Sequence, residues 1–105
     1  MLTQDTAIEI VRNYASEIQG CGINLRSVIL YGSFAKGTQH EWSDIDVALV
    51  ADEFTGFTFN DCKLYSGLGI RKPYIRIEEK TYPTDYFQKG DPFIEEIKKT
   101  GIKIM

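Results

Sequence analysis

The sequence contains few of the side chains that bind zinc. Its 105 residues include two cysteines and one histidine. Cys21 and Cys62 lack CxxC spacing, and His40 is the single histidine, so a zinc site is not expected. We expect both cysteines to be reduced and to serve as small core residues, as is usual in a cytoplasmic protein.

Long apolar segments and an excess of positive charge are also missing. No apolar run approaches the ~20 residues of a membrane-spanning helix, and the N-terminus does not resemble a signal peptide, so we expect a cytoplasmic protein without a membrane span. Acidic residues outnumber basic ones by 15 to 12. Because binding to a nucleic-acid duplex usually requires a basic surface, such binding is not expected. An acidic chain can still bind nucleotides, because a metal ion can bridge carboxylates to phosphates.

A single domain over residues 1–105 is expected. The length is close to that of the commonest domains, and the sequence has no repeat, low-complexity segment or linker. Its hydrophobic share of 43 % and charged share of 26 % are ordinary for a folded domain, which argues against disorder and against a coiled coil.

Helical periodicity is clear near both ends of the chain. Residues 3–19 carry apolar side chains at helical spacing, and two glycines follow them. Near the C-terminus, Asp91 precedes Pro92, a pair typical of a helix start, which predicts a helix over 93–99. Residues 60–68 favour a short helix only weakly, because glycines lie in and around them.

Apolar and alternating patterns predict the strands. They cover residues 27–31, 44–50 and 74–78, with 102–104 as either a short closing strand or a docked tail. Helices are few and the strands are unevenly spaced along the chain. The predicted fold class is therefore α+β (α/β), a small mixed β-sheet with its helices on one face.

Two aspartates interrupt the strand predicted over 44–50. Asp44 and Asp46 point to the same side of a strand, with Cα atoms ~6–7 Å apart. Such a pair alone is more often an ordinary exposed pair on the open face of a sheet. Aspartate is disfavoured within strands, however, and adjacent carboxylates repel each other unless a cation neutralises them. Because all the ligand atoms are oxygens, the pair predicts a site for Mg²⁺ or Mn²⁺.

A Gly-Ser turn precedes this strand. Gly32 lets the backbone approach a phosphate closely, and the Ser33 hydroxyl and nearby N–H groups can donate to phosphate oxygens. A Gly-Ser dipeptide alone is usually a plain turn. Here ten residues separate it from Asp44, and strands flank both motifs, which makes the combination far more specific.

The combination resembles the nucleotidyltransferase superfamily related to DNA polymerase beta, in its smallest form, the minimal nucleotidyltransferase (MNT) domain. Gly32, Ser33, Asp44 and Asp46 match the two motifs of that family, and Lys36 fits the basic residue that follows Gly-Ser. The resemblance implies a nucleotidyltransferase fold and ATP or another nucleoside triphosphate (NTP) as substrate. It also implies that the two aspartates are catalytic metal ligands and that the Gly-Ser turn binds the β- and γ-phosphates.

The resemblance implies a third carboxylate on a later strand, commonly an aspartate. Glu78 and Glu79 are the candidates in this chain. With Ile75 and Ile77 on the helix-covered side, Glu78 shares the open side with the two aspartates, so we expect it to be the third catalytic and metal-binding residue. A bulge that shifts the register would select Glu79 instead.

A basic side chain is also expected to neutralise the charge that develops during phosphoryl transfer. The candidates are Lys36, Arg71, Lys72 and Arg76. We favour Arg76 for nucleotide binding, because it is predicted to share the open face. Among the other residues near the motifs, Trp42 is expected to pack within its loop, and Phe57 is expected in the core or on a partner surface rather than against a base.

The implied activity is metal-dependent transfer of a nucleoside monophosphate from ATP or another NTP to an acceptor hydroxyl on protein, RNA or a small molecule. Domains of this size resemble the antitoxin of a toxin–antitoxin pair whose partner is a HEPN-type helical protein, and there the acceptor is a protein tyrosine. The alternative is an inactive nucleotidyltransferase fold that acts by binding its partner. Glutamate at the third carboxylate position leaves this alternative open.

Overall fold

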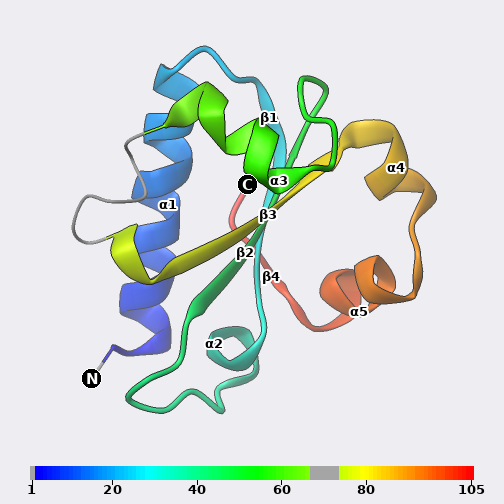
Figure 1. Cartoon of the computed structure of the whole chain (residues 1–105). Helices are drawn as coiled ribbons and strands as arrows, with labels where there is room; N and C mark the ends of the chain where they lie inside the picture. The colour runs from blue at the N-terminus through cyan, green and yellow to red at the C-terminus, as the bar shows by residue number, and fades with distance from the viewer. Residues whose placement is uncertain (1, 67–73) are drawn as a thin grey trace.

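The computed structural model describes residues 2–66 and 74–105 (Figure 1). Five helices, two 3-10 turns and four strands are assigned in these ranges. In chain order they are α1 (Gln4–Gly20), β1 (Leu25–Tyr31), α2 (Ser33–Lys36), β2 (Ile45–Ala51), α3 (Thr58–Asp61), η1 (Cys62–Tyr65), η3 (Tyr74–Arg76), β3 (Ile77–Pro83), α4 (Thr84–Lys89), α5 (Pro92–Thr100) and β4 (Ile102–Lys103).

The strands form one mixed sheet in the order β3-β2-β1-β4. β1 pairs antiparallel with β2 and with the short edge strand β4, whereas β2 pairs parallel with β3. The closing segment near the C-terminus is therefore a strand. The predicted fold class, a small mixed sheet with helices in an α+β arrangement, is confirmed.

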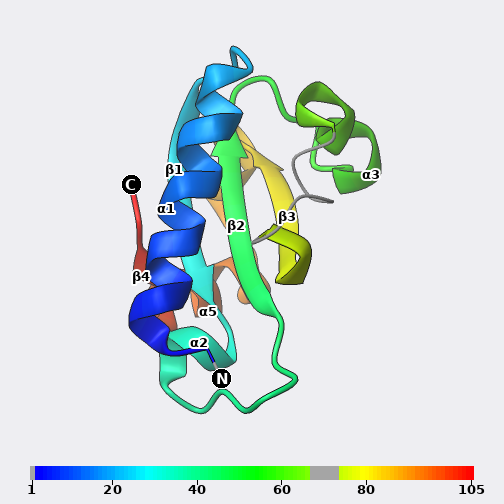
Figure 2. The ribbon, with the colours of Figure 1, turned by 90° about the vertical axis from the view of Figure 1, so that its left-hand side faces the viewer.

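Helices cover both faces of the sheet, which differs from the predicted arrangement. Helix α1 lies across one face of the sheet (Figure 2). It packs there on apolar side chains that include Val28, Leu30, Val47 and Leu49. On the other face, α4 and α5 cover a smaller apolar cluster. The helices contribute Phe87, Ile94 and Ile97, and the strands contribute Ile29, Ala48, Val50 and Tyr82. The prediction of helices on one face is thus wrong. The chain after β3 returns across the opposite side of the sheet, and its two short helices bury that half.

Side-chain caps fix the starts of the two longest helices. The Thr3 hydroxyl accepts a hydrogen bond from Thr6 N at 3.1 Å before α1, and Asp91 Oδ1 accepts one from Ile94 N at 2.8 Å before α5. Both helices occur where they were predicted. In the part of the chain that the structure describes, no helix is long and apolar enough to cross a bilayer.

The segment before β3 departs from the predicted strand. Residues 74–76 form the 3-10 turn η3, and the strand begins only at Ile77. Tyr74 is consequently buried against Tyr14 of α1, with ring centroids 5.0 Å apart, while Ile75 is exposed. The prediction that Ile75 lies on the helix-covered side is therefore wrong, because a 3-10 turn repeats every three residues rather than every two. Ile77 still packs on the α1 side, as predicted.

Other local differences lie outside the motifs. Helix α4 follows Pro83 directly and was not predicted. The helix predicted over 60–68 is replaced by the short elements α3 and η1 up to Tyr65, and its last two residues lie outside the described ranges. Cys21 is exposed at the end of α1, so the prediction of a core position fails for it, while Cys62 is half-buried.

A buried carboxylate ties the segment after β2 to β3. Asp61 is 2 % exposed and accepts hydrogen bonds from Thr55 N, Thr55 Oγ1, Gly56 N and Thr81 Oγ1. Burial acts to raise its pKa, but the hydrogen bonds from Thr81, Thr55 and Gly56 outweigh burial and hold the pKa of Asp61 below its ordinary value. The charged form of Asp61 therefore stabilises the fold.

We predict that Asp61→Asn lowers the free energy of unfolding by about 2 kcal/mol at pH 7, because the donors around it lose an ionised acceptor. Folding depresses the pKa, so this contribution is complete above the unfolded pKa of ~4 and is lost as the pH falls below it. Urea denaturation at pH 7 and pH 3 measures both effects. A difference that persists unchanged at pH 3, or an equal loss in the exposed Asp85→Asn control, would contradict the prediction.

Candidate active site

The chain turns at Gly32, between β1 and α2, in a backbone conformation that essentially only glycine adopts, with φ +77° and ψ −153°. A Cβ at this position would lie 2.3 Å from Oδ2 of Asp46. Gln4 of α1 holds α2 in place, because its Nε2 donates to the carbonyl oxygens of Phe34 and Ala35 at 2.9 and 3.2 Å. The Gly-Ser turn therefore lies directly against the Asp-x-Asp strand.

The strand register brings two of the predicted carboxylates side by side. Asp46 on β2 is paired with Tyr31 on β1 and with Glu78 on β3. Paired residues on neighbouring strands project to the same face, so these three side chains form a row across the sheet. Asp44 lies immediately before β2, at the same end of this row.

The row concentrates negative charge. Partial burial, together with the nearby Glu78 and Asp44 carboxylates, raises the pKa of Asp46 to about 6. Burial also raises the pKa of Tyr31, and the charge of Asp46 adds to that effect. Burial is the larger cause for both groups, and the neighbouring carboxylates add negative charge that a bound cation would relieve.

Glu79 points to the opposite face. Its partner in the register is Val47, which lies in the core beneath α1. Burial raises the pKa of Glu79 as well, and a weaker contribution comes from Glu78. Of the two candidates, Glu78 is the one that the structure places beside Asp46; its role as the third metal ligand stays a prediction.

Arg76 holds the loop that leads into the Asp-x-Asp strand. Its Nη2 donates to the carbonyl oxygens of Glu41, at 3.0 Å, and of Ser43. The Ser43 hydroxyl in turn accepts a hydrogen bond from His40 N at 2.9 Å. Arg76 was favoured as a nucleotide-binding residue, but in this structure its guanidinium contacts the backbone directly before Asp44.

The other basic candidates occupy different surroundings. Lys36 on α2 is exposed, with its Nζ 3.9 Å from a carboxylate oxygen of Glu96. Arg71 and Lys72 lie outside the described residues. Lys80 was not singled out from the sequence, although it follows Glu78 by two residues and therefore shares its face. That spacing was the signal that would have identified it.

Trp42 lies in the loop between the two motifs and was expected to pack within it. Its side chain is instead 81 % exposed. Ile75, which directly precedes Arg76 in η3, is 66 % exposed. Two large apolar side chains thus face solvent next to the residues that position Asp44.

The donor set suits a hard divalent cation. Within residues 2–66 and 74–105, no three His, Cys, Asp or Glu side chains already adopt an arrangement that holds a metal ion. Asp44, Asp46 and Glu78 nevertheless offer only carboxylate oxygens, and burial together with the other two carboxylates raises the pKa of Asp46. Mg²⁺ typically takes one or two protein carboxylates and completes its coordination with water and substrate phosphates. These residues fit that requirement.

Comparison with known families decides the class of protein. A family model described as a nucleotidyltransferase domain matches residues 8–104. The chain belongs to this family. The match covers nearly the whole chain and confirms the resemblance to the minimal nucleotidyltransferase domain of the polymerase beta-like superfamily. No curated protein matches the sequence.

Membership gives this nucleotidyltransferase domain a general chemistry. The family transfers nucleotidyl groups, takes NTP substrates and generally uses a divalent metal. The matched range includes the Gly-Ser turn, the Asp-x-Asp strand and Glu78. The roles of individual residues rest on the geometry described above.

We predict that Asp46→Asn stabilises the metal-free protein at pH 8 by about 1 kcal/mol, a figure discounted for partial exposure. Folding raises the pKa of Asp46 from 3.8 to about 6, so its contribution to stability is complete below pH 3.8 and is lost as the pH rises through 6. Urea denaturation in EDTA at pH 4 and pH 8 should show a gain only at pH 8. An equal gain in the exposed Asp44→Asn variant, or none at pH 8, would refute the explanation.

We predict that Gly32→Ala costs roughly 1–3 kcal/mol of stability and weakens Mg²⁺–ATP binding, because the backbone is strained and the new Cβ displaces the Asp46 carboxylate. Gly37→Ala is the matched control, since Gly37 also has a positive φ but has nothing within 4 Å of an added Cβ. Calorimetric titration with ATP should show weaker binding for the first variant only. Equal ATP affinities in the two variants would exclude a role for close packing at Gly32.

Proposed function

We propose that this nucleotidyltransferase domain transfers a nucleoside monophosphate from ATP or another NTP to an acceptor hydroxyl. The observation that carries the proposal is the register of β2 with β3, which sets Glu78 beside Asp46 while Gly32 closes on the same Asp46 carboxylate. Two motifs and a third carboxylate that are distant in the sequence thus meet at one end of the sheet.

Asp44, Asp46 and Glu78 are the residues that would hold Mg²⁺ or Mn²⁺. When bound, the divalent metal would neutralise the phosphate oxygens and the charge that develops on the attacking and leaving oxygens. The raised pKa of Asp46 supports this assignment, because a carboxylate held close to two others gains most from a cation.

The other groups bind and orient the reactants. The Ser33 hydroxyl and the backbone N–H groups that follow Gly32 would donate to the β- and γ-phosphates. A carboxylate oxygen of Glu78 would take the proton of the acceptor hydroxyl while the hydroxyl oxygen forms a bond to the α-phosphorus. The bond from the α-phosphorus to the bridging oxygen then breaks, and pyrophosphate leaves. Arg76 would act as a positioning residue, because it fixes the backbone just before Asp44.

We place the acceptor hydroxyl on a protein, in a tyrosine of a HEPN-type helical partner, with this chain as the antitoxin of the pair. Trp42 and Ile75 support a protein acceptor, since large exposed apolar side chains next to a site are typical of protein contacts. A small-molecule acceptor would not require them. The inactive binding module is the outcome to be excluded by experiment.

The decisive measurement is transfer of label from [α-³²P]ATP, with Mg²⁺, to a HEPN-type helical protein that co-purifies with this chain. We predict that Glu78→Gln lowers the transfer rate at least about a hundredfold, because it loses both a metal ligand and a base. Glu79→Gln is the matched control, since that side chain points to the opposite face; its rate should stay within about twofold of the wild type.

Three results would overturn parts of the proposal. No label on any partner, together with no binding of Mg²⁺–ATP, would leave only the binding module. Equal losses in Glu78→Gln and Glu79→Gln would show that the third carboxylate is misassigned. Label on RNA or on a small molecule, with none on protein, would keep the transferase and reject the protein acceptor.

A further inference from the structure

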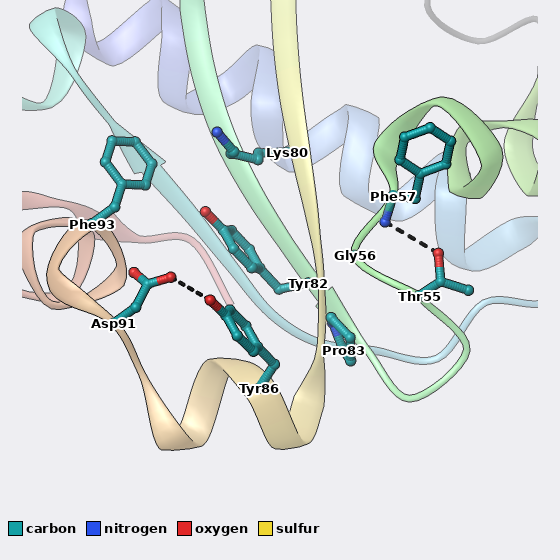
Figure 3. A pocket seen from close by; sticks show the side chains of 9 residues that line it. All are labelled: Thr55, Gly56, Phe57, Lys80, Tyr82, Pro83, Tyr86, Asp91 and Phe93. Atoms are coloured by element: carbon teal, nitrogen blue, oxygen red, sulfur yellow. Dashed lines mark hydrogen bonds between the residues drawn. The ribbon is translucent and has the colours of Figure 1, made fainter.

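An aromatic groove lies on the sheet face that carries the carboxylate row. It has a volume of about 580 Å³ and is bounded by β3, α4, the start of α5 and the loop after β2 (Figure 3). Tyr82, Tyr86, Phe93 and Phe57 supply its aromatic surface, and Lys80 lies at one end. Small-molecule sites are typically concave, of this size, and lined by aromatic side chains with a few polar groups.

The groove lies next to the candidate active site. Glu78, Lys80 and Tyr82 follow one another on the same face of β3, so the aromatic surface begins one side chain beyond the carboxylate. From the other side, the Phe93 ring meets the Tyr31 ring edge-on, with centroids 5.7 Å apart. Tyr31 is the register partner of Asp46. One wall of the groove, Phe93, therefore packs directly on the row that holds Asp46.

The lining fits a flat ring with polar edges. The Tyr82 and Tyr86 rings are nearly parallel, at 6° with centroids 6.3 Å apart, and the Phe93 ring carries the Lys80 ammonium 4.9 Å from its centroid. Asp91 fixes one wall, because its Oδ2 accepts a hydrogen bond from the Tyr86 hydroxyl at 2.6 Å. Phe57 and Phe93 are 60 % and 47 % exposed, so both rings can contact a ligand in the groove, although one face of Phe93 already carries the Lys80 ammonium.

The direction of the triphosphate leads to the same place. The Gly-Ser turn stands at the end of β1, and the carboxylates stand on β2 and β3. If the β- and γ-phosphates lie at Ser33, the nucleoside must continue across β2 toward β3. Lys80, at one end of the groove, is two residues beyond Glu78, which is roughly 7 Å along a strand. A nucleoside attached to an α-phosphate at Asp46 is long enough to enter the groove at that end.

We propose that this groove binds the base and ribose of the NTP, with the nucleoside lying between the opposite walls that Phe93 and Phe57 form and the Lys80 ammonium near the α-phosphate (Figure 3). The inference rests on the proposed function and adds to it the site that selects the nucleoside. It leaves the segments that lead into β2 and β3, where Trp42 and Ile75 are exposed, for the acceptor protein.

The test compares ATP with inorganic tripolyphosphate, both with Mg²⁺, by isothermal titration of the full chain without an acceptor. Phe93→Ala and Phe57→Ala should each weaken ATP binding about tenfold, the usual loss for one stacked base, and leave tripolyphosphate binding unchanged. Phe59→Ala is the matched control, because Phe59 is a similarly exposed phenylalanine outside the groove. It should change neither affinity.

A second measurement uses adenosine alone. Its addition should shift the amide resonances of Gly56 and Phe57 in the wild type, and less in Phe93→Ala. Unchanged ATP affinity in both groove variants would overturn the assignment of the groove to the nucleoside. The proposed function would still stand in that case, because the protein binds ATP. A rise in the KM for the acceptor with no change for ATP would overturn the assignment too and make the groove the acceptor site. If wild-type protein binds neither ATP nor tripolyphosphate, the proposed function fails first.

Discussion

The parallel pairing of β2 with β3 is the constraint on which the rest of the site depends. In its observed register Asp46 lies opposite Glu78, and Val47, which is buried under α1, lies opposite Glu79. A slip of one residue would turn Ile77 and Thr81 out of the core and place Glu79 beside the aspartates. The apolar side chains on the α1 face therefore select which glutamate joins the carboxylate row.

The Asp-x-Asp strand and the Gly-Ser turn could be read from the sequence because they depend on local chemistry. Alternation separates Ile45, Val47 and Leu49 from the aspartates, and the structure places those three side chains in the core. Gly32 is also a local requirement, since its φ is +77°. Each of these features is set by a few neighbouring residues.

The remainder depended on long-range contacts that no local pattern records. Tyr74 and Ile75 alternate like a strand, but in the 3-10 turn Tyr74 packs against the Tyr14 ring while Ile75 faces solvent. Helix α4 and the second covered face arise from the way Phe87, Ile94 and Ile97 meet the far side of the sheet. The position of Arg76 also follows from that turn, which directs its guanidinium to the loop before Asp44. Tertiary packing overrides two-residue periodicity in such short segments.

The hydrogen bonds of Asp61 have a consequence beyond stability. They hold Thr55 and Gly56, at one rim of the aromatic groove, to Thr81 on β3, so the rim belongs to the rigid sheet rather than to a free loop. A ligand that enters a preformed rim loses little affinity to ordering of the protein. A ligand can therefore bind at this rim without waiting for the protein to close around it. The rate of binding is then set by diffusional encounter and by desolvation of the two surfaces.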